Sequence, residues 1–342
     1  MVWAAAGLVL AAVGSTILTQ QLDAATVEAR YSAVVFPVIG QGLGAVTGLA
    51  PFSVTEVGAA TLIVLALVGI LRGWRRSVTW AALVGTLAVG WLLFAPLWGL
   101  NYRRAPMAQL FALDVHPTPV AELRTLAEEL VVAAGDAWVP TMADPSNATV
   151  AFAGGPEIYR RAAARYPFLS GDYAKPKALV TSRLISWFGL LGFYSPYTAE
   201  ANLNVDSPNV VLPYVVLHEM AHQRGVAHED EANFVAYLLC REEGDALFRY
   251  SGAWEGMRAA VFGLWAVDQP SAQALWARLD PRVRADSEAY DAWRAAHQSP
   301  LLDFGMKVND TYLRTQGVRD GIQSYGRVVD LLLADRRRRL GG

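Results

Sequence analysis

The segment from residue 218 to residue 231 holds the side chains best suited to chemistry. Three of the five histidines of the chain lie in it: His218, His222 and His228. His218 and His222 are four residues apart, so on a helix their imidazoles project from the same face, one turn apart, and can bind a single ion. The five residues from His218 to His222, HEMAH, match the H-E-x-x-H zinc motif. We therefore predict that His218 and His222 bind Zn²⁺.

Glu219 follows the first histidine and lies near the edge of the same helix face. There its carboxylate can reach a metal-bound water rather than the metal itself. In the mechanism attached to this motif, the metal lowers the pKa of the water and polarises the scissile carbonyl, while the glutamate takes the proton and passes it to the leaving amine. The uncharged residues around the motif are typical of a helix buried beside a cleft. The pattern predicts a zinc-dependent endopeptidase with Glu219 as general base and then acid.

Three residues compete for the role of third metal ligand. His228 completes the longer pattern H-E-x-x-H-x-x-G-x-x-H with Gly225, as in metzincins, but no convincing methionine turn follows. Glu229 and Glu231 stand four and two residues before Asn233. A ligand glutamate on a second helix, with Asp or Asn one turn later to bond a ligand imidazole, is the gluzincin arrangement. We rank Glu229 first, Glu231 second and His228 third.

The first third of the chain differs in composition from the rest. Only seven charged side chains occur before residue 103, too few for a water-soluble domain. Three apolar runs approach the roughly 20 residues that cross a bilayer: Met1–Leu22, Val57–Leu71 and Ser77–Tyr102. We therefore predict a transmembrane region of about three spans over residues 1–104 and a globular domain over residues 105–342.

The arginine cluster at residues 72–76 lies in the short loop between the second and third spans. Cytoplasmic loops are enriched in Lys and Arg, so this loop is expected inside the cell and the globular domain outside. Arg103 and Arg104 weigh mildly against this orientation. The uncharged stretch Tyr31–Thr55 is a second objection, because as a fourth span it would reverse the topology.

The globular region is expected to have an α+β fold, mainly helical with a small sheet, like that of zincin metallopeptidases. Pro213 is placed to open the metal-binding helix and Gly225 to end it. Alternating residues predict a strand over Ala201–Val205. On it, Asn202 and Asn204 either line a cleft in which an edge strand pairs with an extended substrate or cap turns.

Longer strings of residues add a family resemblance. The string HEMAHQRGVAHEDEANFVAYL, preceded by YSPYTAEANLN and followed by DTYLRTQGVRDGIQSYGRVVDLLLA, resembles the bacterial membrane family called domain of unknown function 3810. The resemblance covers most of the chain and implies a gluzincin-type peptidase on N-terminal transmembrane helices. It favours a glutamate ligand over His228. In the last string, Tyr312 and Tyr325 are candidates to donate a hydrogen bond to the oxyanion, or are buried structural tyrosines.

The predicted protein is therefore a multi-pass cell-membrane metallopeptidase with its catalytic domain on the extracytoplasmic side. Its expected partners are membrane lipid and a peptide or protein substrate, such as one from the cell envelope. The net charge of −2 does not indicate a nucleic-acid partner, and the arginine run 336–339 is expected to be a solvated tail. The alternative is a non-catalytic zinc- or ligand-sensing membrane protein with a peptidase-derived fold. Glu219 disfavours it, because a sensor needs no base.

Overall fold

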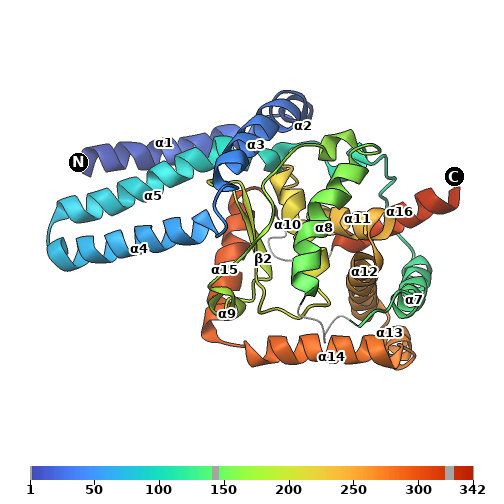
Figure 1. Ribbon diagram of the computed structural model, residues 1–342. Helices are drawn as coiled ribbons and strands as arrows, with labels where there is room; N and C mark the ends of the chain where they lie inside the picture. Colours follow the sequence, from blue (N-terminus) through green and yellow to red (C-terminus); the bar gives the residue numbers. More distant parts are fainter. Residues whose placement is uncertain (1, 141–145, 320–326, 342) are drawn as a thin grey trace.

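Three long apolar helices project from one side of the molecule. The computed structural model describes residues 2–140, 146–319 and 327–341. In it, α1 (Val2–Gln20), α4 (Val54–Gly73) and α5 (Ser77–Leu97) lie side by side and point away from a globular part (Figure 1). Each is long and apolar enough to cross a membrane. The length and composition of these helices therefore support the predicted membrane association.

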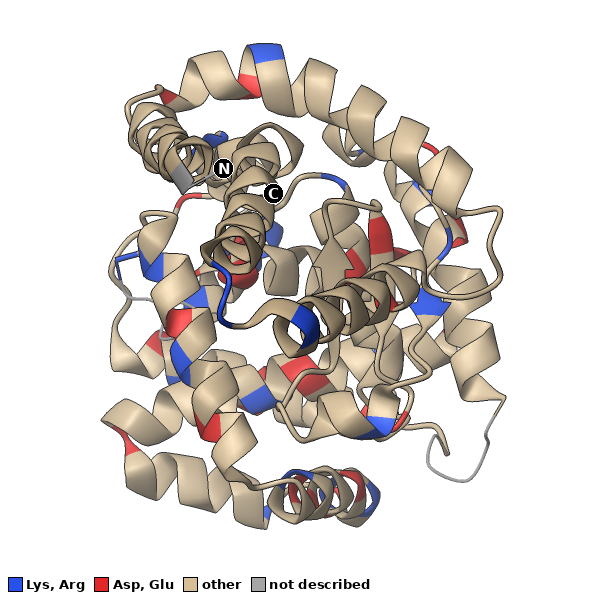
Figure 2. Ribbon diagram, turned by 90° about the vertical axis from the view of Figure 1, so that its left-hand side faces the viewer, with Lys and Arg blue, Asp and Glu red and all other residues tan. Residues whose placement is uncertain are grey.

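The surfaces of these helices suit lipid rather than water. No residue of α4 is buried in the protein, although most of its side chains are apolar. Such a helix is stable where lipid tails cover it and its backbone hydrogen bonds are satisfied internally. Figure 2, viewed from the side on which the helices emerge, shows little charge along them, and the basic loop between α4 and α5 lies at their tips. The N-terminus lies at the same end (Figure 1).

The segment between the first two long helices packs against the globular part. It forms α2 (Ala24–Val27), the π-helix η1 (Glu28–Val35) and α3 (Phe36–Thr47). Arg104, 5% exposed, forms an ion pair of 2.9 Å with Glu28 of this segment. Among the described residues, three helices are candidate spans and this segment is not one of them. By length and composition this segment is not a candidate span, whereas the number of spans and their topology stay predictions.

A small sheet lies beside α10 (Leu212–Gln223), the helix that carries His218 and His222. Its strands are β1 (Lys177–Ala178), β2 (Gly192–Ser195) and β3 (Glu200–Leu203), in the order β1-β3-β2. β1 is parallel to β3, and β2 is antiparallel to it, with Gly192 opposite Leu203 and Ser195 opposite Glu200. β3 is the buried centre and β2 is an edge strand.

The burial of Asn202 in β3 and of Asn204 directly after it overturns the cleft hypothesis for these two asparagines. Both are fully buried. Asn202 accepts a hydrogen bond from Ser53 Oγ at 2.7 Å, and Asn204 donates to the carbonyl of Leu190 at 2.8 Å. Both side chains satisfy neighbouring polar groups inside the protein, so they are structural.

Two buried helices cross the core of the globular part. α10 (Leu212–Gln223) has Pro213 in its first turn and ends before Gly225, whose φ of +77° favours glycine. A Cβ at that glycine would lie 2.9 Å from Oδ1 of Asn101, so close packing requires the glycine as well. α11 (Glu229–Glu243) follows and packs on α10. The predicted start of the first helix at Pro213 and its end before Gly225 are confirmed.

The remaining helices surround this core, so the mainly helical fold with a small sheet is confirmed. They are η2 (Gly99–Arg103), α6 (Met107–Leu110), α7 (Val120–Asp136), α8 (Asn147–Ala162), η3 (Pro167–Leu169), α9 (Ser182–Ser186), α12 (Ala246–Val267), α13 (Gln269–Ala277), α14 (Pro281–Ala296), α15 (Pro300–Thr315) and α16 (Val328–Gly341). The arginine run lies in α16 and is not a free tail. Arg336 pairs with Glu129 and Arg337 with Glu122, both on α7.

Candidate metal centre

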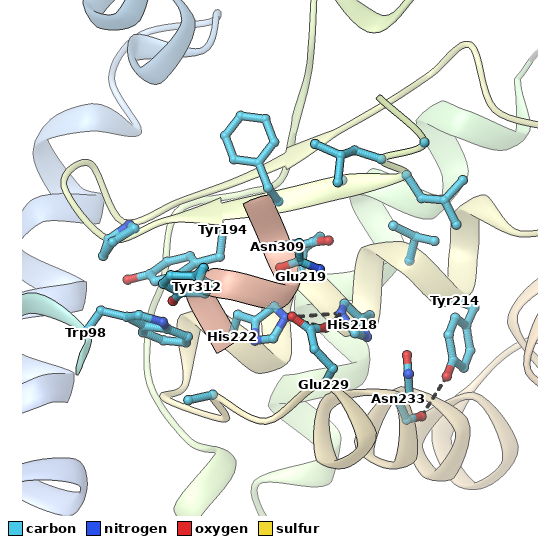
Figure 3. Close-up of a pocket in the computed structure, with 18 of the residues that line it drawn as sticks. Trp98, Tyr194, Tyr214, His218, Glu219, His222, Glu229, Asn233, Asn309 and Tyr312 are labelled. Carbon is cyan, nitrogen blue, oxygen red and sulfur yellow. Dashed lines mark hydrogen bonds and ion pairs between the residues drawn. The ribbon is translucent and has the colours of Figure 1, made fainter. Parts of the chain in front are cut away.

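Three side chains from α10 and α11 converge on one point (Figure 3). Nε2 of His218 lies 3.1 Å from Nε2 of His222 and 3.1 Å from Oε2 of Glu229. Nε2 of His222 lies 3.6 Å from the same carboxylate oxygen. The helical spacing places the two imidazoles together, and the turn at Gly225 brings the start of α11 back to face them. The structure thus joins the two predicted histidines to the first-ranked glutamate.

The triangle of ligand atoms fits a zinc ion. Zinc bonded at about 2.0–2.1 Å with tetrahedral angles holds neighbouring ligand atoms about 3.3 Å apart. The observed separations of 3.1, 3.1 and 3.6 Å bracket this value. A point about 2.05 Å from all three atoms lies about 0.8 Å out of their plane, close to the 0.7 Å or so of an ideal tetrahedron. Among the described residues, no fourth histidine, cysteine or carboxylate joins the group, so one vertex has no protein ligand.

The second nitrogen of one imidazole has a partner that orients the ring. Nδ1 of His222 lies 2.6 Å from the carbonyl oxygen of Val226, to which it donates, so Nε2 is the ring nitrogen that faces the centre. Nδ1 of His218 is buried and has no hydrogen-bond partner among the described residues. Asn233 lines the pocket, but its backbone oxygen accepts from Tyr214 and its side chain bonds neither imidazole (Figure 3). The expected bond from Asn233 to a ligand histidine is therefore absent.

The centre is strongly coupled electrostatically. Burial favours the neutral acid of Glu229, but the His222 imidazole and hydrogen bonds from both histidines lower its pKa well below the usual range. Burial likewise disfavours the imidazolium of His222, yet the Glu229 carboxylate raises its pKa to about 9. The glutamate is therefore ionised, as a cation ligand must be.

The two lower-ranked candidates have other partners. Oε1 of Glu231 accepts a hydrogen bond of 2.7 Å from the backbone N–H of Met107, and so caps α6. The ring of His228 stands edge-on to Tyr102, and its Nε2 lies 3.3 Å from the carbonyl oxygen of Tyr102. Neither residue belongs to the convergent group.

Glu219 is not one of the three convergent side chains, and its carboxylate lies against the sheet. Its side chain is buried, and desolvation raises its pKa to about 7 against the opposing effect of both histidines. The carboxylate packs directly under Gly192 of β2, where a Cβ would meet Cγ and Oε1 of Glu219 at 2.9 Å. A glycine at this position therefore allows the strand and the carboxylate to lie in contact.

The outer edge of β2 pairs with no other strand among the described residues. The N–H of Asn204 donates to the carbonyl of Leu191 at 2.9 Å, which defines one hydrogen-bonded pair between β2 and β3. Such pairs alternate along antiparallel strands, so the N–H and C=O groups of Gly192 and Tyr194 point to the open edge. An extended peptide can add there as a further strand.

A cavity of about 530 Å³ connects these groups. Phe94 and Trp98 at the end of α5 line one side, and Asn309 and Tyr312 of α15 line another. The hydroxyl of Tyr102 donates to the hydroxyl of Tyr312 at 3.0 Å, which leaves the Tyr312 proton free for another acceptor. The second candidate tyrosine, at position 325, lies outside the described residues.

Several residues of the cavity were not anticipated. Asn309 precedes Tyr312 by three residues on one helix, so both side chains lie on one face. This spacing could have identified Asn309 as a neighbour of the candidate Tyr312. β2 and Trp98 were not predicted to border the site. The edge-on contact of Trp98 with His222, 5.7 Å between ring centres, has no sequence signal.

Comparison with known proteins identifies the family but no activity. A family model described as "Protein of unknown function (DUF3810)" matches residues 31–333. No curated protein and no solved structure matches the chain. Because the family match spans most of the sequence, the chain belongs to the DUF3810 family.

Proposed function

We propose that this member of the DUF3810 family is a membrane-anchored zinc metalloendopeptidase of gluzincin type, in which His218, His222 and Glu229 bind zinc and Glu219 is the general base. One observation carries the proposal. A ligand triangle with tetrahedral zinc spacing lies beside a buried carboxylate, in a cavity bordered by an open strand edge. A zincin-like fold of the globular part belongs to the same proposal.

Each side chain has a distinct role in peptide hydrolysis. Zinc bound at this centre would supply Lewis-acid polarisation of the scissile carbonyl and would lower the pKa of water. Glu219 takes the proton of the attacking water and delivers it to the leaving amine. Tyr312, whose own oxygen accepts from Tyr102, directs its proton toward the carbonyl oxygen as negative charge develops there. Gly192 and Tyr194 hold the substrate backbone as an added strand.

The missing fourth ligand favours an enzyme over a zinc sensor. Structural zinc sites are usually closed by four protein ligands, whereas catalytic sites keep one position for water or substrate. Among the described residues only three side chains converge here, and all three line the cavity. Glu219 adds a base for which a purely structural site has no use.

The arrangement of the spans supports an extracytoplasmic catalytic domain. Arg72, Arg75 and Arg76 lie at the tips of the spans, at the end opposite the globular part. Basic loops favour the cytoplasmic side, so the globular part belongs on the other side. Arg104 does not oppose this orientation, because it is buried and paired with Glu28.

The test compares the purified full-length protein with its Glu219→Gln variant. We expect about one zinc per chain in both proteins and cleavage of a peptide library by the wild type only, with a loss of about 10²–10⁴-fold in the variant. Elemental analysis gives the zinc content, and mass spectrometry gives the cleavage products. Zinc in both proteins with no cleavage by either would favour the sensor alternative. Absence of zinc from the wild type would overturn the assignment of the centre.

A further inference from the structure

Resting on the proposed peptidase function, we infer that the substrate is a membrane-tethered polypeptide, cleaved about three residues outside the bilayer and anchored on the N-terminal side of the cleaved bond. Four features lead to this substrate class: the height of the centre above the membrane, the rigid link between spans and sheet, an apolar face beside the spans, and the direction of β2.

The metal centre lies at the level where α5 leaves the membrane. α5 has 21 residues, which corresponds to about 31 Å of helix and matches the roughly 30 Å of a hydrocarbon core. Trp98 follows directly after this helix, and its ring lies 5.7 Å from that of His222. Phe94, still within α5, contacts Tyr312 edge-on at 5.9 Å between ring centres. The centre is therefore within about 10 Å of the hydrocarbon boundary, which an extended chain covers in about three residues.

The globular part cannot easily hinge away from this position. Glu200 of β3 is fully buried and accepts hydrogen bonds from the backbone N–H groups of Val54 and Thr55, the first residues of α4. Nζ of Lys177 pairs with the same carboxylate at 2.6 Å. Glu56, also in α4, accepts from the N–H of Thr181 at 2.8 Å. The sheet that covers Glu219 is thus joined directly to a membrane span.

An apolar face continues from the spans along the globular part. α15 runs across the globular ends of the spans (Figure 1). Leu301, Phe304 and Val308 form an exposed stripe on one of its flanks, at the spacing of one helix face. Near the start of α15, Leu184 and Trp187 of the α9 region are also exposed. We assign lipid as the occupant of this face, because it lies where the spans enter the globular part and no protein element covers it among the described residues.

The direction of β2 determines which end of the substrate faces the membrane. β2 begins over Glu219 at Gly192 and runs toward the spans, since the hydroxyl of Tyr197, just after it, donates to the carbonyl of Gly90 in α5 at 3.0 Å. Antiparallel pairing is the more stable arrangement. A substrate strand antiparallel to β2 enters from the membrane end and runs outward. Its anchor therefore precedes the cleaved bond.

The experiment uses the full-length protein reconstituted in vesicles of phosphatidylcholine and phosphatidylglycerol. A peptide that the wild type cleaves in solution is fused after an N-terminal transmembrane anchor with spacers of about 3, 10 and 30 residues. We expect the shortest version to be cleaved at least as fast as the longest. A C-terminal anchor with the same short spacer should slow cleavage by about 10-fold or more, because the substrate strand would then have to run parallel to β2.

The outcomes separate this inference from the proposed function. Cleavage of the long-spacer substrate and the free peptide, with resistance of the short-spacer substrate, would overturn the placement at the bilayer. Equal cleavage of N- and C-anchored short substrates would overturn the strand direction. If wild type and Glu219→Gln are equally inactive on every substrate, including the free peptide, the proposed peptidase function itself fails.

A second measurement tests the membrane-facing surface without activity. The single cysteine, Cys240, is buried, so a cysteine introduced elsewhere can be labelled selectively. Phe304→Cys on α15 and Phe262→Cys on α12 replace phenylalanines of similar exposure, 60% and 69%. A fluorophore at position 304 should be quenched by quencher-bearing lipids at least about threefold more than one at position 262. Equal quenching at both positions would overturn the assignment of lipid to this face.

Discussion

A methyl group added at Gly192 should disable the proposed base while leaving the metal ligands in place. The Cβ of Gly192→Ala would lie 2.9 Å from Cγ and Oε1 of Glu219 and 2.9 Å from the carbonyl oxygen of Asn202. Ordinary contacts of this kind are 3.4–4 Å. Asn202 belongs to the central strand, which is hydrogen-bonded on both sides and cannot give way. Glu219 or β2 must therefore shift by about 0.5–1 Å.

A shift of this size has a predictable cost. Misplacement of a reacting group by about 1 Å reduces catalysis by about 10²-fold, so we expect kcat to fall by about 10–100-fold. Overpacking should also lower the free energy of unfolding by about 1–3 kcal/mol. The zinc content should be unchanged, because the three ligand atoms lie on α10 and α11 and not on β2.

The assay measures kcat with a peptide that the wild type cleaves, zinc content by elemental analysis, and the melting temperature in the same detergent. Gly42→Ala is the matched control, because a Cβ at that helical glycine meets no atom within 4 Å. It should leave kcat and zinc unchanged. If Gly192→Ala had the kcat of the wild type, the close contact between β2 and Glu219 would not be required for catalysis. Loss of zinc together with activity would show that the substitution acts through the ligands instead.

Three further changes test other parts of the structure. Glu229→Gln should weaken zinc binding by about 10²-fold or more, measured by competition with a chelator. Glu231→Gln should retain zinc and only lower the stability of the fold, because the Glu231 carboxylate caps α6. Tyr312→Phe should lower kcat by about 10–10³-fold with zinc retained and little change in KM; an unchanged kcat would remove this hydroxyl from the mechanism. Burial alone would raise the pKa of Glu200, but its bonds to Lys177 and to the start of α4 lower it. The stability that the ionised carboxylate contributes is therefore complete above about pH 4.5 and is lost as the pH falls through the lowered pKa. Glu200→Gln should lower the free energy of unfolding by about 3 kcal/mol at neutral pH. The difference in melting temperature between this variant and the wild type should become smaller below about pH 4.5. A difference that does not change with pH would contradict this prediction.

Elements whose signals are local could be predicted from the sequence. The long apolar runs specify three helices long and apolar enough to cross a membrane, because a helix in lipid needs only its own residues to satisfy its backbone. Pro213 and Gly225 mark the ends of α10 through their backbone restrictions alone. The four-residue spacing likewise places His218 and His222 on one face of that helix.

Which other residues meet these histidines depends on tertiary packing. Three candidates for the third ligand lie within four residues of sequence, and their roles diverge because each faces a different neighbour: Glu229 faces the imidazoles, Glu231 the start of α6, and His228 the ring of Tyr102. The place of β3 at the centre of the sheet, which removed Asn202 from the cleft, depends on pairing between strands distant in the chain. Trp98 reaches His222 because α5 ends beside α10, across more than 100 residues of sequence. Such contacts arise from packing between elements, which local patterns do not encode.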